Sequence, residues 1–319
     1  MSIPERMSSS DLPGKGEPTF VHLSTNKDGT TKMQPLDPRA ERFFIEDTEQ
    51  TRTQLQALAT NTDGLNMERL HYFREQMNAL KTPIQFLDTD SYESVLQKRE
   101  RKSDPEGLYI AELRMAFVRR NMALEALNST AITESFAVHE AAHSSRIETP
   151  IRVMHTTIGR LFKKSVIEMS QSRSGYNVMP ASNNEQPYGY TLEEGYAELE
   201  RGLYVQSHDL VGHFTAGAAN YELVKESPIP LHYWFKREEN ERVALTIAPG
   251  ALAATVLEIL MKHDDSLFAT LRESRQNIHG LRSTAQSING LMPGLYSELQ
   301  HANESDIIDI LASVIKHFR

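Results

Sequence analysis

The sequence predicts an α+β fold that is predominantly helical, with a small β-sheet or hairpin in its middle third. In the first half and in the last third, apolar residues recur at steps of three and four, which is the period of an α-helix. Between these regions, directly after Pro150, β-branched residues are concentrated. The chain has 319 residues, of which 39% are hydrophobic and 24% charged. This length and composition are ordinary for a globular protein with a sizeable core.

The first third of the chain begins polar and then becomes helical in pattern. Residues 1–36 are rich in Ser, Pro, Gly and Lys, so we expect a flexible N-terminal tail. From Asp37 onward we expect a single domain, 37–319, in which a helical part, 37–127, packs on the part 128–319. Three helices are predicted in the first part because each begins with an Asn or Asp cap, two of them followed by proline, and continues with apolar residues at helical spacing: 37–59, 66–80 and 105–127.

The second part of the chain is predicted to contain a helix, a small sheet and then further helices. Thr133 is a potential N-cap for the first of these helices. The stretch Ser172-Arg173-Ser174-Gly175 is typical of a turn and is flanked by short apolar runs, which predicts a hairpin. The predicted strands are 151–157, 165–169 and 176–179, a polar loop covers 180–187, and helices are expected from Thr191 onward and over 238–263, 266–278 and 305–318.

The overall charge and the residue types present exclude several classes of protein. A net charge of −9 argues against a general nucleic-acid or anionic-membrane surface. The chain has no cysteine, so a metal ion would have to be held by His, Asp or Glu. No secretory signal is visible, and the most apolar run, 248–261, is interrupted by Pro249 and Gly250. We therefore expect a cytoplasmic protein with no nucleic-acid partner and no membrane insertion. The sequence does not indicate the oligomeric state.

Two histidines in the predicted helix after Thr133 have the spacing of metal ligands. The segment reads Phe-Ala-Val-His-Glu-Ala-Ala-His and places His139 and His143 four residues apart, with Glu140 beside the first. Positions i and i+4 lie on one face of a helix, so both imidazoles can reach one cation. Glu140 is then close enough to handle a metal-bound water. This pattern predicts Zn²⁺ as the cofactor and indicates a zinc-dependent hydrolase.

A catalytic zinc needs at least three protein ligands, and a second motif offers the third. The segment Leu192-Glu193-Glu194-Gly195-Tyr196-Ala197 resembles the glutamate motif of gluzincin-type zinc metallopeptidases. This resemblance implies a zincin-like fold, Glu194 as the third ligand and Glu140 as the general base. It also implies that Glu198 accepts a hydrogen bond from a ligand histidine. The helical spacing agrees, because Glu194 and Glu198 at i and i+4 share one helix face.

The expected activity is hydrolysis of a peptide bond in a peptide or protein substrate. The oxyanion that forms needs a hydrogen-bond donor. Tyr188 and Tyr190 are favoured because they directly precede the predicted helix that carries Glu194 and Glu198, called here the glutamate helix. Arg146 or Arg173 would suit a clamp for a substrate carboxylate, which would imply carboxypeptidase action. Other oxyanion candidates that the spacing does not separate are Tyr176, His155, Arg173, His208 and His213.

Two other interpretations of the same residues remain open. The chain could be a non-catalytic protein that keeps a zincin scaffold and binds a peptide or protein partner. It could also be an all-helical interaction module in which His139 and His143 are partly buried helix residues. In that case Glu193, Glu194 and Glu198 would form a solvated acidic face. The presence of Glu140 favours the enzyme, because a binding protein has no need of a general base.

Overall fold

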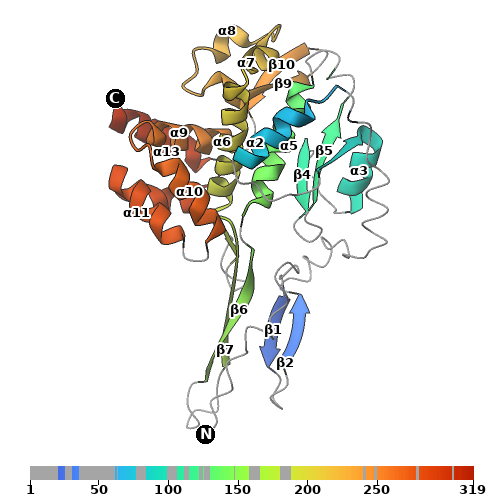
Figure 1. Ribbon diagram of the computed structural model, residues 1–319. Helices are drawn as coiled ribbons and strands as arrows, with labels where there is room; N and C mark the ends of the chain where they lie inside the picture. Colours follow the sequence, from blue (N-terminus) through green and yellow to red (C-terminus); the bar gives the residue numbers. More distant parts are fainter. Residues whose placement is uncertain are drawn as a thin grey trace.

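The computed structural model shows an α+β fold that is mostly helical, with several small sheets (Figure 1). Helices α5 (Ala131–Ser144) and α6 (Tyr190–Ser207) pack against each other at the centre. A sheet covers α5, and helices of the last third cover α6. No helix in the ranges described is long and apolar enough to cross a membrane. The structure describes residues 21–25, 31–35, 62, 64–76, 84–98, 106–110, 115–121, 125, 130–146, 148–157, 166–179, 188–239, 242–247, 250–277, 280–303 and 305–319.

A three-stranded mixed sheet lies against α5. Its order is β3 (Ile84–Asp88), β5 (Met115–Arg120), β4 (Gly107–Ile110); β3 is parallel to β5, and β4 is antiparallel to it. Helix α3 (Thr89–Lys98) packs on β3 and β5. The predicted helix 105–127 is therefore wrong. Every residue of β5 is buried, so its apolar side chains do not alternate with polar ones and the period of two is lost.

The central helices agree with the sequence predictions more closely. Helix α5 is almost entirely buried, which suits its small apolar residues. It begins at Ala131, so the prediction that Thr133 caps it is wrong; the Thr133 hydroxyl instead donates a hydrogen bond of 2.8 Å to Glu125. The helix expected from Thr191 is α6. Helix α2 (Met67–Gln76) lies within the predicted 66–80 and packs on α5, whereas the predicted helix 37–59 lies outside the described residues.

Two antiparallel sheets extend away from the helices (Figure 1). The predicted strands after Pro150 are confirmed as β6 (Glu148–Thr157), β7 (Val166–Ser174) and β8 (Asn177–Met179), in the order β6-β7-β8. A second pair, β1 (Val21–Thr25) and β2 (Thr31–Pro35), lies within the range expected to be a flexible tail. The Val and Thr residues of these strands favour extended backbone.

The last third combines one hairpin with a group of packed helices. Strands β9 (Trp234–Glu239) and β10 (Arg242–Ile247) pair antiparallel, so the predicted helix 238–263 is wrong in its first half; Val243, Leu245 and Ile247 show the period of a strand. The remaining elements are α7 (Val211–Thr215), α8 (Tyr221–Val224), η3 (Leu231–Tyr233), α9 (Ala251–Met261), α10 (Leu267–Gln276), α11 (Leu281–Leu291), α12 (Leu295–His301) and α13 (Asp306–Phe318).

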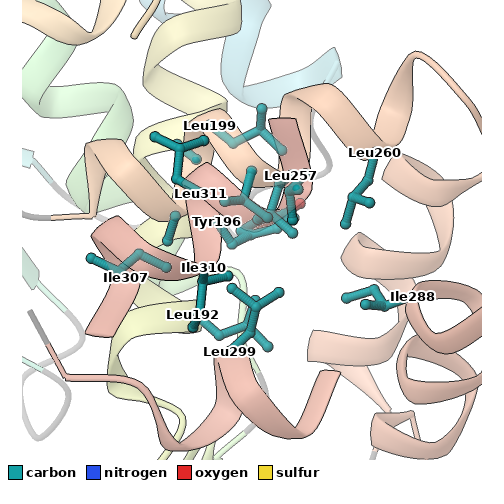
Figure 2. Packing of buried hydrophobic residues seen from close by; sticks show 14 of the residues in the cluster. Leu192, Tyr196, Leu199, Leu257, Leu260, Ile288, Leu299, Ile307, Ile310 and Leu311 are labelled. Carbon is teal, nitrogen blue, oxygen red and sulfur yellow. The ribbon is translucent and has the colours of Figure 1, made fainter. Parts of the chain in front are cut away.

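The largest core cluster joins the glutamate helix to this helical group. Tyr196 and Leu199 of α6 pack with Leu257 of α9 and Leu311 of α13 (Figure 2). All four are essentially inaccessible to solvent. Helix α6 is therefore held between α5 on one side and α9 on the other, which fixes the position of any side chain at the boundary between α5 and α6.

Candidate metal centre

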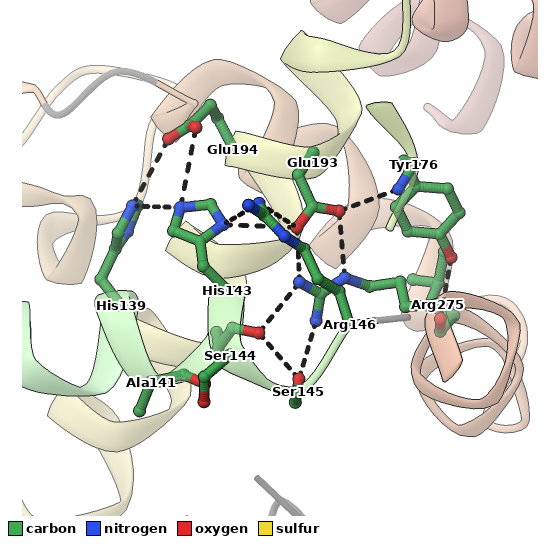
Figure 3. A network of polar contacts seen from close by, with 12 residues as sticks. His139, Ala141, His143, Ser144, Ser145, Arg146, Tyr176, Glu193, Glu194 and Arg275 are labelled. Carbon is green, nitrogen blue, oxygen red and sulfur yellow. Dashed lines mark hydrogen bonds and ion pairs between the residues drawn. The ribbon is translucent and has the colours of Figure 1, made fainter. Parts of the chain in front are cut away.

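Three side chains from α5 and α6 converge on one point, as the sequence predicts for zinc ligands (Figure 3). Nε2 of His139 lies 3.3 Å from Nε2 of His143 and 3.4 Å from Oε2 of Glu194. Nε2 of His143 lies 3.6 Å from Oε1 of Glu194. Around a zinc ion with bonds of about 2.0–2.1 Å, tetrahedral angles place neighbouring ligand atoms roughly 3.4 Å apart. The spacing and chemistry of these donors therefore fit a tetrahedral zinc ion with one position left for water.

Two buried glutamates hold the far ring nitrogens of the two histidines. Nδ1 of His139 lies 3.2 Å from Oε2 of Glu198, as expected, and Nδ1 of His143 lies 3.3 Å from Oε1 of Glu193. When each Nδ1–H donates to its glutamate, the lone pair of each Nε2 is directed to the common point. Sequence reasoning did not assign this contact to Glu193. The available signal was its position directly before Glu194, which lets both carboxylates reach α5 from one turn of helix.

The electrostatics of the cluster favour positive charge between the carboxylates. Burial acts to lower the pKa of His139, but hydrogen bonds to Glu194 and Glu198 outweigh it and raise that pKa to about 10. Burial acts to raise the pKa of Glu194, but the neighbouring histidines hold it below its ordinary range. Charged carboxylates buried this deeply need a cationic partner. Protonated histidines can supply that charge, and so can a divalent cation.

Glu140 lies in the same cleft as the three donors. Its side chain is largely buried, and the cleft has a volume of about 840 Å³. The edge strand β4 passes very close to it: a Cβ atom built on Gly107 would lie 2.6 Å from Oε1 of Glu140. Glycine at this position therefore lets the strand backbone approach the carboxylate. The cleft is also lined by Tyr109 of β4 and by Phe235, Arg237 and Thr246 of the β9–β10 hairpin, none of which was assigned to the site from the sequence.

The structure separates the tyrosines considered as oxyanion donors. Tyr190, the first residue of α6, is 56% exposed and lines the cleft. Tyr188 lies outside the cleft lining and stacks on His301, with 5.2 Å between ring centroids. Tyr176 is fully buried, and its hydroxyl donates a hydrogen bond of 2.9 Å to the carbonyl of Leu271. The contacts of Tyr176 therefore suit packing, and Tyr190 is the better placed of the three for contact with a substrate.

The remaining sequence candidates fall in different places. His208 caps the end of α6, where its Nδ1 lies 3.0 Å from the carbonyl of Tyr204, and neither His208 nor His213 lines the cleft. Arg146 does line it, with its guanidinium 5.4 Å from the ring centroid of Tyr109. The side chains of His155 and Arg173 lie outside the described residues.

Comparisons with known proteins give no further assignment: no protein-family model, no curated protein and no solved structure matches the chain.

Proposed function

We propose that the protein is a zinc-dependent peptide-bond hydrolase with a zincin-like fold. The observation that carries this proposal is the convergence of three donors beside Glu140. Nε2 of His139 and Nε2 of His143 lie 3.3 Å apart, and each lies 3.4–3.6 Å from one of the two carboxylate oxygens of Glu194, in the cleft that Glu140 also lines. Zinc bound to these three residues would supply a water with its pKa lowered towards about 7.

Glu140 is the group that would move protons in this reaction. It accepts a proton from the attacking water and later delivers it to the nitrogen of the leaving amine, so it ends the cycle unprotonated. It follows His139 in the sequence, lies against the Gly107 backbone and lines the same cleft as the three donors. Tyr190 is proposed as a donor to the developing oxyanion, because it lines the cleft at the start of the glutamate helix.

The strand β4, which borders the cleft, supports a peptide substrate. Among the described strands β4 pairs with β5 on one side only, and it contributes Gly107 and Leu108 to the cleft lining. An extended peptide can add to such an edge through main-chain hydrogen bonds. Gly107 and Leu108 would then run alongside the segment of substrate nearest to Glu140.

The test compares the wild-type protein with Glu140→Gln. Glutamine keeps the size of the side chain but cannot act as a base, so we expect zinc content near one per chain in both proteins. The rate at which the variant hydrolyses a peptide library should be lower than the wild-type rate by about 10²–10⁴-fold. Glu222→Gln, on the exposed helix α8, is the matched control and should retain full activity.

Three outcomes would count against the proposal. A Glu140→Gln variant that cleaves peptides at the wild-type rate would remove Glu140 from the mechanism. Loss of zinc together with activity in this variant would assign Glu140 a structural role. A wild-type protein that holds zinc but cleaves no peptide would instead be a binding protein on the same scaffold.

A further inference from the structure

A fully buried arginine from the last third of the chain contacts Glu193, which lies beside His143 in the candidate metal centre. Arg275, on α10, makes a two-point contact with Glu193: its Nε lies 3.1 Å from Oε2, and its Nη2 lies 2.5 Å from Oε1 (Figure 3). Glu193 is the carboxylate that contacts Nδ1 of His143. Two-point contacts between arginine and carboxylate fix the orientation of both groups.

The same guanidinium also donates hydrogen bonds at the C-terminal end of α5, the helix that carries His139 and His143. Nη2 of Arg275 donates to the carbonyl of Ala142 at 3.0 Å, and Nη1 donates to the hydroxyl of Ser145 at 3.1 Å. The carbonyl of Ala142 lies in the last turn of α5, where it also accepts hydrogen bonds from the backbone N–H of Ser145 at 3.1 Å and from the Ser145 hydroxyl at 2.7 Å. Cζ of the Arg275 guanidinium lies over the ring of Tyr196, 4.1 Å from the ring centroid. Arg275 therefore joins α5, α6 and α10 beside His143.

The other ligand histidine has an equivalent support that stays within α6. His139 contacts Glu198, and Nε of Arg201 donates to the other oxygen of Glu198 at 2.6 Å. Arg201 is three residues further along the same helix, whereas Arg275 is separated from Glu193 by 82 positions. The arginine that supports His143 thus comes from a distant helix, whereas the arginine that supports His139 lies on α6 itself and also donates to the carbonyl of His232 in η3 at 3.2 Å.

Arg275 is the closer of two arginines at the buried carboxylate of Glu193. Its Nε and Nη2 lie 3.1 Å and 2.5 Å from the two carboxylate oxygens, whereas Nη1 of Arg146 lies 3.5 Å from Oε1. An ionised Glu193 accepts from Nδ1–H of His143 and leaves Nε2 free for a metal. Removing the arginine would leave a buried carboxylate without its main cation.

We propose that Arg275 is a positioning residue of the metal centre, which fixes Glu193 and the last turn of α5 and thereby orients His143 towards the metal. This inference rests on the proposed function, because it requires that His139, His143 and Glu194 hold zinc. It adds a requirement that the two sequence motifs do not contain, namely the docking of α10.

The test measures zinc affinity, by competition with a chromophoric chelator, in Arg275→Met and Arg275→Lys. Loss of an outer hydrogen-bond partner lowers metal affinity by about 10–100-fold, and we expect that range for Arg275→Met. Lysine keeps the charge and one bond to Glu193, so Arg275→Lys should lose less than about tenfold. Arg272→Met, one turn earlier on α10 and stacked on Phe268, is the control and should bind zinc like the wild type.

A second set of measurements separates positioning from general destabilisation. If Arg275 acts through Glu193, the double variant Glu193→Gln/Arg275→Met should bind zinc within about threefold of Glu193→Gln alone. It also avoids the buried unpaired carboxylate that could stop Arg275→Met from folding. The visible absorption spectrum of the Co²⁺-loaded protein should shift in Arg275→Lys, because the geometry around the metal changes.

The results distinguish this inference from the proposed function. A wild-type protein without zinc affinity would overturn both. A wild-type protein that binds zinc, with unchanged affinity and Co²⁺ spectrum in Arg275→Met and Arg275→Lys, would overturn only the role of Arg275. Additive losses in the double variant, with a wild-type Co²⁺ spectrum in Arg275→Lys, would make Arg275 a structural residue and also overturn the inference.

Discussion

The glycine that follows Glu194 in the glutamate motif has a packing role. A Cβ atom on Gly195 would lie 2.6 Å from Cβ of Ala253 on α9 and 3.2 Å from the Ala253 backbone. A Cβ atom on Gly250, which has φ of +86°, would lie 2.6 Å from the backbone carbonyl of Glu194. The turn of α6 that carries Glu194 therefore packs closely against the start of α9, and this contact fixes the position from which the Glu194 side chain projects.

Gly195→Ala tests this contact. Alanine would normally stabilise a helix interior by about 1 kcal/mol relative to glycine. Here we expect the free energy of unfolding to fall by about 1–3 kcal/mol instead, because α9 has to move. Gly290→Ala on the exposed face of α11, where an added Cβ meets nothing within 4 Å, should raise it by about 0.5–1 kcal/mol. Urea denaturation measures both; a Gly195→Ala variant as stable as the wild type would refute the packing role.

Among the elements, α3 has a clear N-terminal cap. Oδ1 of Asp88 accepts a hydrogen bond of 2.8 Å from the backbone N–H of Ser91, in the first turn of this helix. This hydrogen bond lowers the pKa of Asp88 from its ordinary value of 3.8. Because β3 ends at Asp88 and α3 begins at Thr89, the cap also fixes the corner between the sheet and its covering helix.

Asp88→Ala should lower the free energy of unfolding by about 1 kcal/mol at pH 7. The pKa of Asp88 is lower in the folded state, so the stabilisation is complete above pH 3.8 and is lost as the pH falls through the folded-state pKa. Denaturation curves of both proteins between pH 7 and pH 3 measure the difference. A difference that grows on acidification would contradict the assignment of Asp88 as the cap.

Elements with a strong local pattern were predictable, and those defined by distant contacts were not. Helices α5 and α6 and the turn between β7 and β8 carry their signals within a few residues. Strands β4 and β5 do not, because both are short and β5 is buried along its whole length. The same reason governs the site: helical spacing predicts His139, His143 and Glu194, whereas the contact of Arg275 with Glu193 leaves no pattern in the sequence.

At the scale of the whole molecule, the candidate site lies where three groups of elements meet. The sheet β3-β5-β4 supports α5 from one side, the C-terminal helices support α6 from the other, and the β9–β10 hairpin contributes to the cleft. Each group supplies part of the site: Gly107 from the sheet, Phe235 and Arg237 from the hairpin, and Arg275 from the helices. Metal binding by the native fold should therefore stabilise all three together.

The most direct measurement is the mass of the intact wild-type protein and of His143→Ala by native mass spectrometry after purification without added metal. We expect one zinc ion per wild-type chain. We also expect at least tenfold lower occupancy in His143→Ala, because two protein ligands hold zinc far more weakly than three. A natively folded wild-type protein that carries no zinc and takes up none when it is supplied would show that His139, His143 and Glu194 do not form a zinc site.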